Sequence, residues 1–296
     1  MPNFITYNIL NNHFDNEANF IISDENIGCL ESNFRFDKIK EKLLPFIKKK
    51  SVIALQEVSN LWGGKLFIWF QENSYMFKVY NYGNKWSDHM GIALAIPMEY
   101  KIIEFSQKVI SENINIKEAE ESYFDKLWYS VREYFKYRDQ RDLISIRNAK
   151  KRHNAIMAVK LLINDKEYWF STYHFPCAFY DKLLMELHAK ACIEWLNKLD
   201  GLVIFGTDMN SLPKSSVYNL FKESFKSVYY DYYNKEPVST NKINNKSFGK
   251  FSGTIDYIWI SKQIKIKSVK KIPNVIKEMP NINEPSDHLS ISCEIE

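Results

Sequence analysis

The chain has 296 residues and a net charge of +4, with 45% hydrophobic and 15% aromatic residues. This composition excludes a dominantly disordered chain, and nine glycines and nine prolines exclude a collagen-like one. The four cysteines form no Cys-x-x-Cys pair, so we expect free thiols rather than a disulfide scaffold or a zinc cluster. No stretch approaches the ~20 apolar residues of a membrane span, and the N-terminus does not resemble a signal peptide. We therefore expect a cytoplasmic protein that does not associate with membranes.

Apolar runs of strand length recur along the chain, with helical patterns between them. Apolar residues three and four positions apart predict helices over residues 36–49 and 181–199. Residues 118–140 are aromatic and highly charged, which favours a helical insertion, and residues 235–245 are expected to form a polar loop. The irregular alternation of strands and helices predicts an α/β or α+β sandwich. The runs cover residues 4–9, 51–55, 91–96, 155–163, 168–173, 202–205, 255–260 and 289–295.

Polar residues able to bind ligands or transfer protons stand where these runs end. Asn8 is the last residue but one of the first run, Gln56-Glu57 follows the second, and His174 follows the run at 168–173. Strand ends are rigid and can hold such side chains around one site. Taken singly, each is more often a solvated strand end, a turn or a structural histidine, so the weight lies in the complete ordered set. Its later members are Asp208, Asn210, Asp256, Asp287 and His288.

This ordered set resembles the endonuclease/exonuclease/phosphatase superfamily, which has the fold of pancreatic deoxyribonuclease, and the resemblance runs from Thr6 to Ile295. The segments around Asn8, Asp208 and Phe251 resemble the branch that contains the poly(A) deadenylases, nocturnin and the 2′-phosphodiesterases. The resemblance implies one catalytic domain over residues 1–296. Its fold would be an α/β (α+β) four-layer sandwich, in which two packed mixed β-sheets are flanked by helices.

The chain departs from the pattern of this superfamily at two places. Residues 175–179, directly after His174, do not match the deadenylase segment, so the resemblance makes no prediction for the nucleotide pocket on that side. Thr207 separates Gly206 from Asp208, where the superfamily usually has the glycine directly before the aspartate.

The resemblance implies a divalent metal site built from Glu57, Asn8 and Asp287. Glu57 would be the main carboxylate ligand and Asp287 a further one, while Asn8 would position the metal or the phosphate. Mg²⁺ suits such a sparse oxygen site because it keeps several of its waters, and Mn²⁺ is expected to substitute for it.

Five further residues receive catalytic roles from the resemblance. Asp208 would orient or deprotonate the attacking water, and Asn210 would donate to a phosphate oxygen. His174 and His288 would stabilise charge in the transition state. Asp256 would fix the tautomer of His288 and favour its charged form.

Two sets of residues are candidates for substrate binding. The resemblance implies that Phe251 stacks on a base; the alternative is a loop aromatic that packs on its own strand. Arg147, Lys151 and Arg152, followed by Asn154, lead into the run at 155–163 and would track phosphates. The alternative for this basic cluster is a solvated turn.

Together, these inferences predict a monomeric, Mg²⁺-dependent phosphodiesterase that acts on nucleic acid, on RNA in preference to DNA. The first hypothesis is a 3′-to-5′ exoribonuclease resembling the deadenylases. The alternatives are an enzyme for a nucleotide cofactor or phosphoinositide, a 5′-end or tyrosyl-DNA phosphodiesterase, and an inactive binding module.

Overall fold

The computed structural model describes residues 2–15, 19–82, 90–114, 133–247, 249–274 and 276–296, and these contain two six-stranded sheets. The first sheet has the order β13 (Ile266–Val269), β14 (Ile291–Ile295), β1 (Asn3–Asn8), β2 (Val52–Gln56), β4 (Met90–Pro97) and β3 (Tyr75–Tyr82). The second has the order β5 (Lys101–Val109), β6 (Ala155–Ile163), β7 (Lys166–His174), β8 (Leu202–Asp208), β12 (Asp256–Ile260) and β9 (Lys226–Ser227). Both sheets mix parallel and antiparallel pairs.

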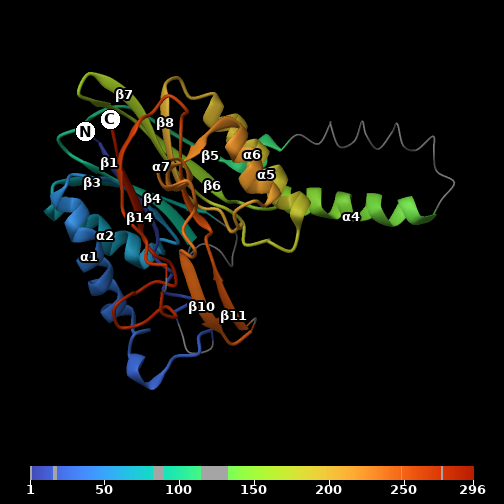
Figure 1. Ribbon diagram of the computed structural model, residues 1–296, viewed down its shortest axis with the longest axis horizontal. Helices are drawn as coiled ribbons and strands as arrows, with labels where there is room; N and C mark the ends of the chain where they lie inside the picture. The colour runs from blue at the N-terminus through green and yellow to red at the C-terminus, as the bar shows by residue number, and fades with distance from the viewer. Residues whose placement is uncertain (1, 16–18, 83–89, 115–132, 248, 275) are drawn as a thin grey trace.

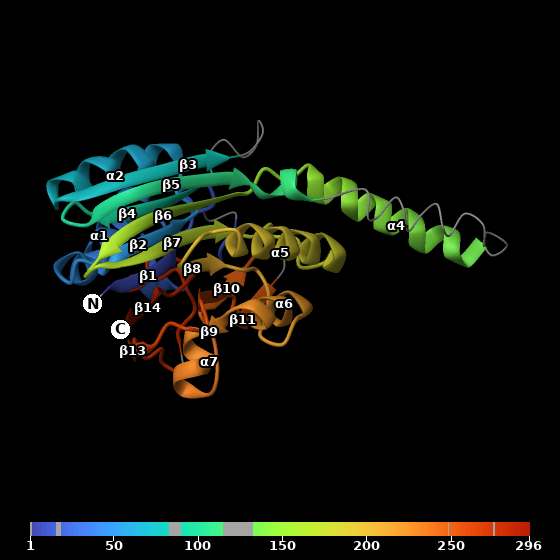
Figure 2. The same cartoon turned by 90° about the horizontal axis from the view of Figure 1, so that it is seen from above.

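Helices cover the outer faces of the two sheets (Figures 1 and 2). On the first sheet, α1 (Ser32–Lys48) and α2 (Asn60–Glu72) pack through an apolar cluster that includes Ile39 and Trp62. On the second sheet, α5 (Lys182–Asn197) and α6 (Ser216–Ser224) do the same with Trp195 and Phe221. The inner faces form a separate core that includes Phe4 and Ile204. This order of layers confirms the predicted four-layer fold class.

The two helices predicted from apolar spacing are present, with shifted ends. The first begins at Ser32 rather than at residue 36, and the second has Asp181 as its N-cap, whose side chain accepts from the Leu184 amide. For the predicted insertion at 118–140, residues 118–132 lie outside the described part of the chain. From residue 133 onward, α4 (Glu133–Lys150) extends away from the sheets (Figure 2).

The prediction of a polar loop over residues 235–245 was wrong, because its last part is a strand. Strand β10 (Asn241–Asn245) pairs with β11 (Gly249–Gly253) in a separate two-stranded sheet. Every second residue of β10 is buried, and two of these three residues are asparagines. A search for alternating apolar residues therefore does not detect this strand.

Strand alternation decides which side chains face the space between the sheets. On β1, Ile5 and Tyr7 pack against the helices, so Phe4, Thr6 and Asn8 face the second sheet. On β8, Ile204 faces inward, and Gly206 and Asp208 share its face. A side chain at 206 would place its Cβ 2.6 Å from the Cβ of Thr6, so only glycine allows this approach.

Thr207 faces the opposite side of β8, where its hydroxyl donates to the carbonyl of Tyr173 (2.7 Å). The residue between Gly206 and Asp208 thus keeps both of them on the inner face. Among the described residues, no helix is both long enough and apolar enough to cross a membrane.

A buried histidine joins the end of α4 to the second sheet. His188 is fully buried; its Nε2 lies 3.0 Å from the carbonyl of Ala149 and its Nδ1 lies 2.8 Å from the hydroxyl of Tyr173. Because a carbonyl only accepts, Nε2 carries the proton and Nδ1 accepts from the hydroxyl. Burial lowers the pKa of His188 to about 4.

This depressed pKa predicts a loss of stability in mild acid. The unfolded chain takes up a proton at His188 below the ordinary pKa of 6.5, whereas the folded chain takes it up only near pH 4. The stability that neutral His188 confers is complete above pH 6.5 and falls by up to about 3 kcal/mol as the pH approaches 4. Urea unfolding from pH 7 to 4.5 should lose less stability in His188→Gln than in the wild type. Equal losses in the two proteins would contradict this account.

Candidate active site

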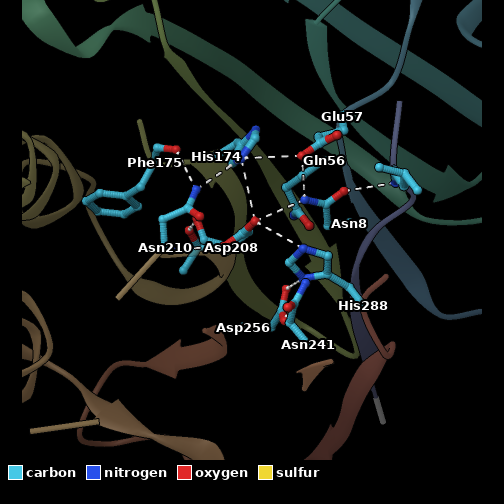
Figure 3. A network of polar contacts seen from close by, with 12 residues as sticks. Asn8, Gln56, Glu57, His174, Phe175, Asp208, Asn210, Asn241, Asp256 and His288 are labelled. Atoms are coloured by element: carbon cyan, nitrogen blue, oxygen red, sulfur yellow. Dashed lines mark hydrogen bonds and ion pairs between the residues drawn. The ribbon is translucent and has the colours of Figure 1, made fainter. Parts of the chain in front are cut away.

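The predicted residues meet at one end of the two packed sheets (Figure 3). Asn8 ends β1, and Glu57 directly follows β2, its parallel neighbour. His174 and Asp208 end the parallel strands β7 and β8 and are direct partners in the register. Asp256 begins β12, opposite Asp208. The strand ends therefore bring together five residues that are far apart in the sequence.

The side chain of Asn8 links carboxylates that belong to different sheets. Its Nδ2 donates to Oε1 of Glu57 (3.0 Å) and to Oδ2 of Asp208 (2.9 Å). Its Oδ1 accepts from the amide of Leu10 (3.0 Å), which orients the side chain. Asn8 therefore bridges the carboxylates of Glu57 and Asp208. Its contact with a metal or a phosphate remains a prediction.

Three non-glycine residues beside the site have left-handed backbones: Leu10 (φ 52°), Glu57 (φ 60°) and Asn210 (φ 47°). Such conformations cost about 1–3 kcal/mol each and cluster at functional sites. At Glu57 the turn ends the strand and brings Oε2 to the amide of Asn11 (3.0 Å). The Glu57 side chain is 14% exposed and that of Asp208 only 2%, so Glu57 lies nearer the solvent.

The two predicted histidines have different partners. His288 Nδ1 lies 2.9 Å from Oδ2 of Asp256. Burial by itself would lower the pKa of His288, but Asp256, Asp287 and Asp208 outweigh it and raise this pKa well above its ordinary value. His174 Nδ1 instead lies 3.1 Å from the hydroxyl of Tyr82, and its Nε2 lies 3.5 Å from Asp208. The neighbouring carboxylates therefore favour the charged form of His288.

Asn210 lies beside His174 on the same edge. Its backbone amide donates to Oδ1 of Asp208 (2.9 Å), so Asp208 is held through both of its oxygens. Its Nδ2 donates to the carbonyl of Phe175 (3.1 Å) and lies 3.3 Å from Nε2 of His174.

Two neighbouring residues that the sequence analysis missed brace the carboxylates around His288. The Thr240 hydroxyl donates to Oδ2 of Asp256 (2.6 Å) and accepts from the amides of residues 255 and 256. Asn241 Nδ2 lies 3.4 Å from Oδ2 of Asp287. Both residues fall in the segment predicted to be a loop, and only the pairing of β10 would have identified them.

Arg35 is a further residue near the site that was not predicted from the sequence. It is fully buried in α1, where Nη2 donates to the carbonyls of Ile9 and Leu10 (2.7 Å each) and Nε to that of Pro285 (2.5 Å). Nη1 pairs with Asp15 (2.6 Å). Arg35 therefore joins the segment that follows Asn8 to the segment that precedes Asp287.

The donor set fits a divalent metal ion. Donor atoms of Glu57, His174 and Asp208 lie within 4.8 Å of one another. Among the described residues, the ion pairs of Glu57, Asp208, Asp256 and Asp287 involve only histidines, with no lysine or arginine within 4.0 Å. Carboxylate oxygens are the ligands that Mg²⁺ and Mn²⁺ prefer.

The predicted substrate-binding residues lie in two places, the basic turn at the end of α4 and strand β11. Asn154 Nδ2 donates to the carbonyl of His174 (2.9 Å), which fixes the basic turn to the edge of the site. Arg147 and Lys151 are exposed at the end of α4 and just after it, and Arg152 is half-buried. Phe251 is half-buried on β11 and packs against a small cluster that contains Leu10. Phe251 therefore packs against the protein, and its stacking on a base remains a prediction.

Comparison with known proteins gives one match to a curated sequence, and no protein-family model matches the chain. Nocturnin from Homo sapiens is 32% identical over 108 residues, which cover 31% of this chain and 24% of nocturnin. The sequence match thus spans about a quarter of that relative.

Similarity between structures extends over the whole chain. The human nocturnin catalytic domain, solved with a bound sulfate anion, has a TM-score of 0.69 at 16% identity and covers 100% of this chain and 94% of its own. ANGEL2, a 2′,3′-cyclic phosphatase solved with adenosine-2′,3′-vanadate, has a TM-score of 0.74 at 15% identity, with coverages of 99% and 95%. An endonuclease/exonuclease/phosphatase from Bacteroides vulgatus has a TM-score of 0.65 at 13% identity, with coverages of 100% and 98%. The chain therefore has the fold of the endonuclease/exonuclease/phosphatase superfamily, which confirms the fold that the resemblance of its motifs implied.

Proposed function

We propose that the chain is a metal-dependent phosphoric ester hydrolase that acts on nucleic acid as a single catalytic domain. The observation that carries this proposal is the convergence of Asn8, Glu57, His174, Asp208 and His288 on one cluster of carboxylates without lysine or arginine partners. The segments around Asn8, Asp208 and Phe251, which resemble the deadenylase and nocturnin branch, together with the local sequence match to nocturnin, support the finer proposal of a deadenylase-like 3′-to-5′ exoribonuclease.

Glu57 would be the main carboxylate that holds the metal ion, Mg²⁺ or Mn²⁺, and Asp287 a further one, since both side chains are more exposed (14% each) than that of Asp208 (2%). When bound, the ion would supply Lewis-acid stabilisation of the phosphate oxygens. Asn8 keeps Glu57 at a fixed distance from Asp208, since one amide group donates to both carboxylates.

Asp208 is suited to orient and deprotonate the attacking water. The Asn8 side chain and the Asn210 amide each donate to one of its oxygens, which fixes the orientation of the carboxylate. Its Oδ2 also lies 3.7 Å from Nε2 of His288. His288, kept charged by Asp256, would offer a proton on Nε2 to a phosphate oxygen, and His174 and Asn210 would contact the phosphate from the other side.

A second candidate is the hydrolysis of cyclic phosphates or other small nucleotides. The similarity to ANGEL2, whose complex contains adenosine-2′,3′-vanadate, favours this candidate. It requires the same side chains and differs only in the substrate.

Cleavage assays separate these proposals. We expect end-labelled RNA to be shortened stepwise in Mg²⁺ and left intact in EDTA, with single-stranded DNA and RNA carrying a 2′,3′-cyclic phosphate as competing substrates. Asp208→Asn should lower the rate by roughly 10²- to 10⁴-fold, because the base is lost. Asp165→Asn, in the turn at the other end of β7, is the matched control and should remain active. Cleavage in EDTA, or full activity of Asp208→Asn, would refute the mechanism; hydrolysis of the cyclic phosphate alone would favour the second candidate.

Thr240 offers a finer test, because its hydroxyl holds Asp256 through the carboxylate and through the amides of residues 255 and 256. Thr240→Val keeps the shape of the side chain but removes the hydrogen bond that orients Asp256, so kcat should fall about 10- to 100-fold with KM unchanged. Thr240→Ser retains the hydroxyl and should restore kcat. Circular dichroism at the assay temperature would establish that both variants are folded. If the valine and serine variants were equally active, Thr240 would not position the site.

A further inference from the structure

Two aromatic side chains stand in solvent on the segment that follows His174. Phe179 is 70% exposed and Tyr180 is 75% exposed, whereas the next most exposed aromatic among the described residues, Tyr232, is 45% exposed. Their rings meet edge to face, with centroids 5.9 Å apart. Adjacent exposed rings make a contiguous apolar patch, and such patches mark contact surfaces more often than scattered single residues do.

The segment that carries these rings is fixed to the site at its beginning. The amide of Phe175 donates to the carbonyl of Asp208 (3.0 Å), and the carbonyl of Phe175 accepts from Asn210 Nδ2 (3.1 Å). At its far end, Asp181 caps α5, and its amide donates to the carbonyl of Ala178 (2.8 Å). At roughly 3.5 Å per residue, the backbone of both residues lies within about 20 Å of that of His174. The segment is therefore anchored to the site at one end and to α5 at the other.

Positive charge lies beside the same segment. The Asn154 side chain fixes the basic turn to the carbonyl of His174 (2.9 Å). Arg152 lies in this turn, two residues before Asn154. In the part of the chain that the structure describes, Arg147, Lys151 and Arg152 have no carboxylate within 4.0 Å. These cations are thus available to bind phosphate groups.

We propose that Phe179 and Tyr180 form a stacking platform for the bases of a single-stranded nucleic acid, with Arg152 and its basic neighbours on the adjoining phosphates. This inference rests on the proposed function and specifies its substrate as an unpaired strand. Bases within a duplex already stack on one another, whereas an unpaired strand can place its bases on protein rings without regard to sequence. The basic flank favours a polyanion over an apolar protein partner.

Binding without cleavage tests the platform most directly. The anisotropy of a labelled short RNA, and of a strand of equal length without bases, would be measured in EDTA. The wild type should prefer the strand with bases. Phe179→Leu and Tyr180→Leu, which keep an apolar side chain but remove the ring, should each weaken RNA binding by roughly five- to a hundredfold and leave binding of the base-free strand unchanged. Tyr180→Phe should bind RNA as the wild type does.

Tyr232→Leu is the matched control, since Tyr232 is also exposed and its ring also meets that of a neighbour, Tyr233, edge to face. It lies on α7 (Val228–Tyr233), beyond β9, which pairs with the end of β12 remote from Asp256. This variant should bind RNA normally.

Each contrary result has its own meaning. Unchanged RNA binding by the leucine variants, with cleavage intact, would overturn the platform and leave the proposed function standing. A wild type that hydrolyses only small phosphate esters and binds no strand would overturn both. If the leucine variants lost affinity for phosphatidylcholine–phosphatidylserine vesicles while keeping RNA affinity, the rings would serve a membrane and the platform would be wrong.

Discussion

The structure depends on holding four carboxylates close together at one end of two packed sheets. Glu57, Asp208, Asp256 and Asp287 repel one another, and among the described residues the only basic side chains within 4.0 Å of them are His174 and His288. Burial, together with the charge of Glu57, raises the pKa of Asp287, although His288 and the more distant Arg35 oppose the shift. Such a cluster costs stability, and a cation that binds to it would recover part of that cost.

Hydrogen-bond donors behind the carboxylates keep this cluster in place. Asn8 spans the two sheets, Thr240 and Asn241 hold the acids on either side of His288, and Arg35 joins the two chain segments near Asn8 and Asp287. Directly beneath, Gln56 Nε2 donates to the hydroxyls of Thr6 and Thr172 (2.8 Å each). Along β1, the space between the sheets therefore changes from the apolar Phe4 through Thr6 to the polar Asn8. The site lies where the apolar core ends.

The residues that form the site could be predicted from the sequence, whereas most of the residues that hold them in place could not. Asn8, Glu57, His174 and Asp208 stand at the ends of apolar runs, so both their presence and their shared edge could be inferred. Arg35 and Thr240 could not, because their partners lie 250 and 16 residues away and nothing local distinguishes them from surface residues. The four layers followed from the resemblance, whereas β10 was missed because its buried positions are mostly asparagines. Phe179 and Tyr180 were not singled out, because only the folded loop reveals their exposure.

The claim that the carboxylate cluster is a divalent-cation site is tested most directly by isothermal titration of Mn²⁺ and Mg²⁺ into metal-free protein. The wild type should bind the ions saturably, and its melting temperature should rise. Glu57→Gln should lose both, and because it relieves charge repulsion, the metal-free variant should melt no lower than the metal-free wild type. Equal metal binding by the wild type and Glu57→Gln, or none by the wild type, would contradict the account.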